Sequence, residues 1–126
     1  MSAKSIAEQR TVIYDTLVNC QIGNVEKYSR ADPIPPVTVI NGPRIDFPDN
    51  SFVGIAEWAI WLMGTRTAPA AALETLDESL TKVLLAFSHG VGIGVVIQRV
   101  ENVVRTSEGV PLPGFTITIA AAVPNC

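Results

Sequence analysis

Two aspartates, Asp46 and Asp49, flank a Phe-Pro pair, and such paired carboxylates can bind a cation or carry out acid-base chemistry. Turn formation explains the same residues more simply, because Asp next to proline commonly forms turns. His89 is the single histidine and stands at the expected end of a helix, where capping or the helix dipole accounts for it. Without a second histidine it cannot form a histidine-based metal site, although it could serve as a general base.

The segment GVGIGVV, with Gly90, Gly92 and Gly94, resembles part of a phosphate-binding loop. A dinucleotide-binding loop follows a strand and opens a helix, whereas these glycines follow an expected helix and open a strand. They therefore predict a helix-to-strand connection. Ser79 and Ser88 lack the G-x-S-x-G context of a nucleophile elbow. The residues predict no catalytic, cofactor or metal site, and we expect a protein that is not an enzyme and has no cofactor.

The composition is unusually apolar for a chain of 126 residues, a length that fits one domain spanning residues 1–126. Hydrophobic residues make up 48% and charged residues 17%, against about 25% charged in typical domains. The nine basic residues are dispersed and the net charge is −3, which disfavours nucleic-acid binding. Cys20 and Cys126 match no metal-binding spacing and are interpreted as inert thiols. The low share of charged residues implies a surface that is either unusually apolar or partly buried by partners.

The sequence contains no apolar segment typical of a membrane span or a secretory signal. No run of about 18 apolar residues occurs, so we expect no membrane span. The N-terminal segment MSAKSIAEQR is polar and has no apolar core of the kind found in secretory signals, which predicts synthesis in a cytoplasm.

The periodicities predict an α+β domain with a mainly antiparallel β-sheet and two helices packed on one face, in the order α-β-β-α-β-β. Apolar residues at helical spacing predict helices over residues 5–21 and from Thr67 or Pro69 to His89. Prolines make residues 26–50 an extended connection, with a short strand at 37–40 that Gly42-Pro43 would end. Arg44 to Phe47 is either a second short strand or loop.

The later strands are expected at 52–64, 93–104 and 115–123, the last two forming a hairpin across a turn at 107–114. A bulge near Arg99 would reconcile the facing of the hydrophobic residues in the first hairpin strand.

The strand FVGIAEWAIWLM is apolar on both of its faces, so it needs cover on both sides of the sheet. Alternation places Trp58, Ile60 and Leu62 on one face, which we expect to lie beneath the helices. It places Ala59, Trp61 and Met63 on the other face, which we expect to contact a neighbouring subunit.

Four isolated arginines could anchor an interface by pairing with carboxylates of a neighbour. A solvated arginine at a strand end explains each of them equally well. They are Arg44, Arg66, Arg99 and Arg105.

The succession of segments resembles the tail terminator proteins of long, non-contractile-tailed bacteriophages, the minor tail proteins of the lambda type. The matching pieces cover nearly all of the chain. They are an N-terminal helix, the approach IPPVTVINGPRIDF, the strand EWAIWLM, the helix LETLDESLTKVLLAF and a hairpin ending in GVPLPGFTITIAAAV.

This resemblance implies a structural virion protein at the head-proximal end of the tail, assembled in the host cytoplasm as a hexameric ring. The ring would cap the tail tube, stop its polymerisation at the length set by the tape measure protein, and offer a joining surface to a head completion or connector protein. DNA would contact it only by passing through the channel. A closed ring needs two different contact surfaces on each subunit.

Facing and exposure arguments then give candidate contact residues. Ala59, Trp61, Met63 and Arg66 are expected at the subunit interface. The loops that would contact the tube or the head contribute Arg30, Arg44, Asp46, Asp49, Glu108 and Pro111.

Two alternatives remain open. One is another neck protein, such as a head-tail connector or a tail completion protein. The other is a small ligand-binding or enzymatic α+β domain that uses the region of Asp46, Asp49 and His89.

Overall fold

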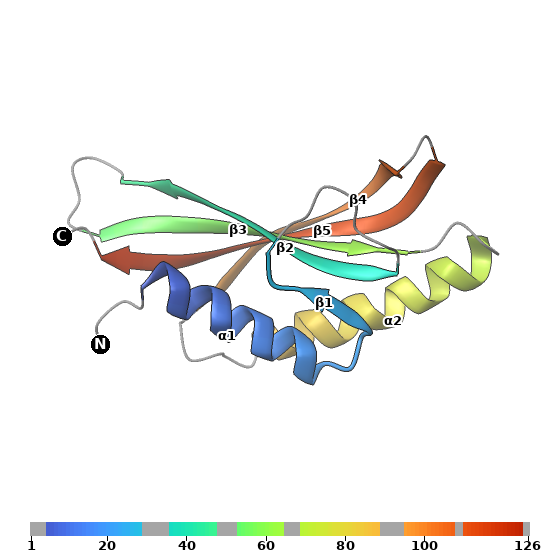
Figure 1. Cartoon of the computed structure of the whole chain (residues 1–126), viewed down its shortest axis with the longest axis horizontal. Helices are drawn as coiled ribbons and strands as arrows, with labels where there is room; N and C mark the ends of the chain where they lie inside the picture. Colours follow the sequence, from blue (N-terminus) through green and yellow to red (C-terminus); the bar gives the residue numbers. More distant parts are fainter. Residues whose placement is uncertain are drawn as a thin grey trace.

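The computed structural model describes residues 5–28, 36–47, 53–64, 69–88, 95–107 and 110–124, which form a five-stranded sheet and two helices (Figure 1). The predicted α+β class, with a mostly antiparallel sheet and two helices, is confirmed. In chain order the elements are α1 (Ile6–Asn19), β1 (Asn24–Glu26), β2 (Val37–Asp46), β3 (Val53–Met63), α2 (Pro69–Ser88), β4 (Val96–Ser107) and β5 (Val110–Pro124).

The strands lie in the order β1-β2-β3-β5-β4. β3 is central and pairs antiparallel with β2 on one side and with β5 on the other, and β4 then pairs antiparallel with β5. The short β1 pairs parallel with the first three residues of β2. Each of the three pairings from β2 through β3 and β5 to β4 is antiparallel. Therefore β2 and β4, on opposite sides of the sheet, run in opposite directions.

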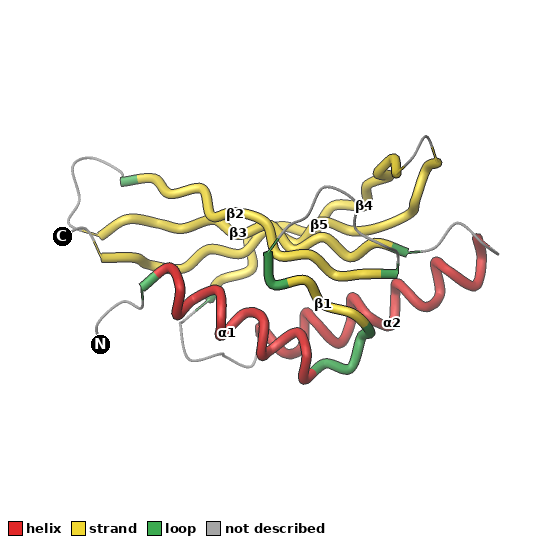
Figure 2. Tube along the Cα trace, in the orientation of Figure 1, coloured by secondary structure: helices red, strands yellow, loops and turns green. Residues whose placement is uncertain are grey.

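Both helices lie along the same face of the sheet, the lower face in Figures 1 and 2. Trp58, Ile60 and Leu62 of β3 point to this face and are at most 2% exposed, as the alternation of the strand predicted. Ile117 and Ile119 of β5 join them in the core. The helices contribute Ile13, Leu17, Leu76, Val83 and Phe87 to the same cluster.

Each helix buries one stripe. In α1, Gln9, Ile13 and Leu17 recur every four residues and are fully buried, so one side of the helix meets the sheet. Ser5 caps the helix: its Oγ accepts a hydrogen bond from the Glu8 backbone N–H at 3.2 Å, while the Glu8 carboxylate accepts one from the Ser5 N–H at 3.4 Å. This reciprocal capping box satisfies two of the donors that a helix start leaves unpaired.

A buried polar bridge fixes α1 to the sheet. The Trp58 indole N–H donates to Gln9 Oε1 at 3.0 Å, and Gln9 Nε2 donates to the Ala122 carbonyl at 2.7 Å. Gln9 and Trp58 are both fully buried, and their mutual hydrogen bond lets these polar groups leave water without a large penalty. The bridge connects α1 to β3 and β5, the two central strands.

Two expectations about the proline-rich segment are wrong. An additional strand, β1, precedes it and ends at Glu26, so the sheet has five strands where the predicted order has four. In addition, Gly42-Pro43 does not end β2: the strand continues to Asp46, with a register shift between Asn41 and Arg44. Gly42 has φ +110°, a conformation that glycine adopts easily, and the bulge gives Pro43 a place where no ladder hydrogen bond is lost.

The hairpin of β4 and β5 is confirmed, but its turn is tighter than expected. Ser107 already pairs with Val110, so most of the residues assigned to a turn at 107–114 are strand. Pro111 and Pro113 lie past the last β3–β5 pair, Met63 with Gly114. The Gly64 N–H still donates to the Pro113 carbonyl at 2.8 Å, a bond that needs no donor from proline. The predicted bulge near Arg99 is present as a register shift between Ile97 and Arg99.

Candidate functional site

The sheet face opposite the helices is the principal candidate surface, because no described helix covers it (Figure 2). Cross-strand pairing places Ala59, Trp61 and Met63 of β3 on this face. The predicted division of β3 into a helix-covered face and a second face is therefore confirmed, whereas the assignment of the second face to a subunit contact stays a prediction.

An apolar cluster occupies one end of this face. Val37 and Val39 of β2, Met63 of β3 and Leu112 of β5 are each at most 6% exposed and pack together. Trp61 is partly buried against them. Met63 is thus already covered within its own chain and has little surface to offer a neighbour, while Ala59 and Trp61 retain part of theirs.

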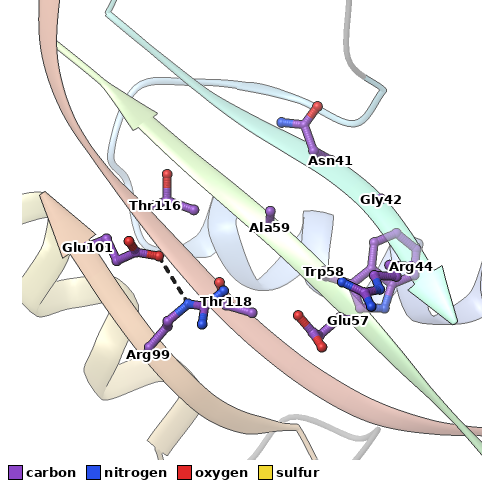
Figure 3. A pocket seen from close by; sticks show the side chains of 10 residues that line it. All are labelled: Asn41, Gly42, Arg44, Glu57, Trp58, Ala59, Arg99, Glu101, Thr116 and Thr118. Carbon is purple, nitrogen blue, oxygen red and sulfur yellow. Dashed lines mark ion pairs between the residues drawn. The ribbon is translucent and has the colours of Figure 1, made fainter. Parts of the chain in front are cut away.

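A hollow of about 260 Å³ follows the apolar cluster at the centre of the face (Figure 3). Small side chains of the middle strands, Ala59, Thr116 and Thr118, form its base. Charged side chains of both signs surround them. The complete lining consists of Asn41, Gly42, Arg44, Glu57, Trp58, Ala59, Arg99, Glu101, Thr116 and Thr118.

Two ion pairs at the hollow each lie within a single strand, and Glu57 of β3 adds a carboxylate opposite Arg44. Arg99 and Glu101 of β4 form an ion pair with 3.0 Å between Nε and Oε1, and their side chains are 65% and 54% exposed. Arg44 and Asp46 of β2 form a longer pair at 3.6 Å, with exposures of 77% and 58%. Exposed pairs of this kind contribute at most about 1 kcal/mol to stability, so they add little to the stability of the fold.

The hollow has little that catalysis requires. Its ionisable groups are arginines and carboxylates that are open to solvent, with no nucleophile beside a base. Among the residues that the structure describes, no group of three histidine, cysteine, aspartate or glutamate side chains could hold a metal ion.

The two sides of the sheet expose different strand edges. β1 covers β2 only at Val37–Val39, so within the described residues the outer edge of β2 has no strand partner from Arg44 onward. On the opposite side, β4 pairs with β5 alone among the described strands. Unpaired edges present N–H and C=O groups that can pair with another chain.

Arg10 determines where the free part of the β2 edge begins. Its guanidinium donates to the Gly42 carbonyl at 2.8 Å and to the Lys27 carbonyl at 3.0 Å. It also lies 4.6 Å from the Tyr28 ring and 4.9 Å from the Trp58 ring, at cation–π distance from both. The side chain therefore closes the edge of β2 at the bulge and leaves the residues after it accessible.

Cys20 lies at the end of α1, beside α2. Burial raises the pKa of its thiol, and the nearby Lys82 ammonium lowers it by a smaller amount. A raised pKa keeps the thiol protonated and unreactive near neutral pH. This agrees with the interpretation of Cys20 as an inert thiol, while Cys126 lies outside the described residues.

The remaining predicted site residues fall into two groups. Arg44 and Asp46 lie on β2 at the rim of the open face, and Pro111 lies in β5, where it pairs with Thr106. The other predicted residues lie outside the described part of the chain: Arg30, Asp49, Arg66, His89, Gly90, Gly92, Gly94 and Glu108.

Sequence reasoning missed the roles of Gln9 and Arg10. Both are polar residues on the side of α1 that faces the sheet, and a polar residue within an apolar helical stripe is a signal of a specific buried partner. Sequence reasoning also missed that Arg44 and Arg99 each have a carboxylate two positions later on the same strand face.

Comparison with protein-family models finds no match to this chain, and comparison with curated proteins finds none either. Among the described residues, no helix combines the length and the apolarity that crossing a membrane requires.

Proposed function

We propose that this protein is a structural subunit that assembles head-to-tail into a ring and terminates the tail tube of a long-tailed bacteriophage. In this proposal the ring binds the last ring of tube subunits, prevents further addition and offers its other side to a head completion or connector protein. It is a virion protein of the head-proximal tail end, and the hexameric number follows from the resemblance of the chain to tail terminators.

The observation that carries the proposal is the pair of unlike sheet edges on opposite sides of one subunit. β4 forms one side, and the second half of β2 forms the other. When one surface of a subunit binds a different surface of the next, an open row of subunits leaves one unbound surface at each end. Closing the row into a ring pairs these two surfaces as well. The open sheet face, with no described helix over it, supplies further surface.

Exposed apolar side chains at the far ends of the sheet also support an assembled state. Phe47 and Ile55 lie where β2 and β3 meet at one end and are 43% and 42% exposed. Val104 of β4, at 66%, pairs with Pro113 toward the other end of the sheet. The apolar side chains at the β2–β3 end provide surface for contact with a partner on one side of a ring.

The experiment combines the mass of the protein in solution with electron microscopy of phage particles assembled without it. The proposal predicts rings, and tails of uncontrolled length that do not join heads when the protein is missing. Tails of normal length that join heads without the protein would reject a terminator. A neck protein of another kind would instead give tails of normal length that fail to join.

A ligand-binding domain is the second candidate, favoured by the hollow with arginines and carboxylates around it. Replacing Glu57, a lining residue of the hollow that the ion pairs Arg44–Asp46 and Arg99–Glu101 do not include, by glutamine distinguishes the two. Loss of a measured turnover would support ligand chemistry, whereas intact ring assembly and tail joining would count against it.

A further inference from the structure

The two sheet edges that have no strand partner among the described residues, the second half of β2 and β4, carry the same charge pattern. On the β2 edge Arg44 is followed two residues later by Asp46, and on the β4 edge Arg99 is followed two residues later by Glu101. Arg44, Arg99 and Glu101 line the same hollow, and Asp46 pairs with Arg44, so all four side chains lie on the face opposite the helices (Figure 3). Each edge thus presents one positive and one negative side chain to whatever approaches it.

Strand direction makes these two patterns complementary. β2 and β4 run in opposite directions within one subunit, since three antiparallel pairings separate them. A copy rotated about an axis along the strands keeps every strand direction, so its β2 would lie antiparallel to the β4 of the first copy. Antiparallel pairing reverses the order of residues, and the basic residue of one edge then meets the acidic residue of the other.

We propose that β4 of one copy pairs antiparallel with the free part of β2 of the next copy, with Arg99 opposite Asp46 and Glu101 opposite Arg44. This inference rests on the proposed ring, for which it names the contact and its register. The residues between these pairs, Val100 and Ile45, then face each other on the helix side. Val100 packs against the core, and Ile45 is 38% exposed in one copy, so the pair buries apolar surface.

The register is specified against its nearest alternatives. A slip by two residues in one direction places Arg99 opposite Arg44, and a slip in the other direction places Glu101 opposite Asp46. Both oppose like charges, which destabilises directly facing strand residues. A slip by one residue moves the charges of one strand to the other sheet face. The regular parts of the strands also coincide, because both bulges end where these segments begin, at Arg44 and at Arg99.

Exchanging the two charges on a single strand tests the register without changing composition or net charge. The β4 variant carries Arg99→Glu with Glu101→Arg, and the β2 variant carries Arg44→Asp with Asp46→Arg. Each keeps an ion pair within its own strand but places like charges opposite each other between copies. Arg44→Asp in the β2 variant also places a carboxylate opposite Glu57 of β3 in its own chain, whereas Arg99 and Glu101 face only Thr118 and Thr116, so the β4 variant is the cleaner test of the contact between copies. Two pairs that change from attraction to repulsion should weaken self-association by about fivefold or more at low salt, and less at high salt.

Complementation is the decisive readout. The chain with all four substitutions restores both opposite-charge pairs and should assemble like the wild type. A 1:1 mixture of the two variants should also assemble, because β4 of each variant matches β2 of the other, and the resulting ring alternates and contains an even number of subunits. A control chain with Glu78→Lys and Lys82→Glu, both exposed on α2, should assemble normally. Circular dichroism confirms that each chain folds.

Sedimentation and native mass spectrometry of these chains give results that decide the inference. Wild-type assembly in both single-strand variants would overturn the register and leave the ring intact. Failure of the fourfold variant and of the mixture would overturn it as well, and so would a wild-type chain that stays monomeric at millimolar concentration. Tails of normal length that join heads without the protein would instead reject the terminator function and leave the register standing.

Discussion

Replacement of Gln9 by leucine should destabilise the fold although leucine is apolar and similar in size. Gln9 is the acceptor for the buried Trp58 indole N–H, at 3.0 Å, and the donor to the Ala122 carbonyl, at 2.7 Å. The substitution leaves the Trp58 donor unpaired in a place where the side chain is fully buried. A buried unsatisfied group costs about 1–3 kcal/mol.

Loss of the hydrogen bond to the Ala122 carbonyl costs less free energy, because Ala122 is exposed and water can replace the lost donor. We therefore expect a loss of about 2 kcal/mol in the free energy of unfolding, dominated by the tryptophan. With a urea dependence of about 1–3 kcal/mol per molar, the unfolding midpoint should fall by roughly 1 M. Circular dichroism in urea measures this change, at a protein concentration where the chain is monomeric, since association would add its own stabilisation.

Two further variants separate the hydrogen bond from other effects of the substitution. Asn19→Leu, at an exposed position at the end of the same helix, should change stability little. The double variant Gln9→Leu with Trp58→Phe removes donor and acceptor together and should cost less than the sum of the single variants. A change below about 0.5 kcal/mol for Gln9→Leu, or strict additivity in the double variant, would refute the buried bridge as a stabilising element.

Three other predictions concern the helix start, the hairpin and the thiol. Ser5→Ala should cost about 0.5–2 kcal/mol in urea unfolding by removing the capping box with Glu8, and an unchanged midpoint would contradict that role. Gly114→Ala should lower the melting temperature, because a Cβ there would overlap the Leu62 carbonyl oxygen, and a melting temperature equal to wild type would show that the backbone can move apart. Burial raises the pKa of Cys20, so in a chain whose C-terminal cysteine is replaced by serine, alkylation at mildly alkaline pH should be slower in the folded than in the urea-unfolded state. Because the folded state favours the neutral thiol, the contribution of Cys20 to stability is fully present at neutral pH and declines as the pH rises past the ordinary pKa of a thiol. Equal alkylation rates in the folded and unfolded states would argue against this.

Local pattern was sufficient for the parts of the fold whose periodicity is strong. The alternation of Trp58, Ile60 and Leu62 with their neighbours fixed both faces of β3, because side chains of a strand point alternately to opposite sides. The helix that begins at Pro69 and buries Leu76, Val83 and Phe87 follows its apolar stripe in the same way.

Elements that depend on distant partners were not predictable from the sequence. β1 has three residues and exists because it pairs parallel with the start of β2, a partner that nothing in Asn-Val-Glu indicates. Gly42-Pro43 has the form of a chain break, yet the bulge and the Arg10 hydrogen bond hold it within β2. Tertiary contacts outweigh local propensity at both places.

The candidate contact surface shows the same limit. Four arginines could be identified as possible interface anchors, but the sequence does not show which of them share a sheet face. The strand order places Arg44 and Arg99 on opposite edges of one face, each with its carboxylate, and this arrangement turns single residues into a pair of complementary edges.

Head-to-tail association is the central claim, and native mass spectrometry of the wild-type chain at high protein concentration tests it most directly. The account predicts a closed particle of one defined size, six times the 13.5 kDa of the single chain if the resemblance to tail terminators holds for its number of subunits. A stable dimer that stops at twice the chain mass would indicate a two-fold contact between identical surfaces, and a monomer at millimolar concentration would indicate no contact. Either result would contradict an assembly built from two unlike sheet edges.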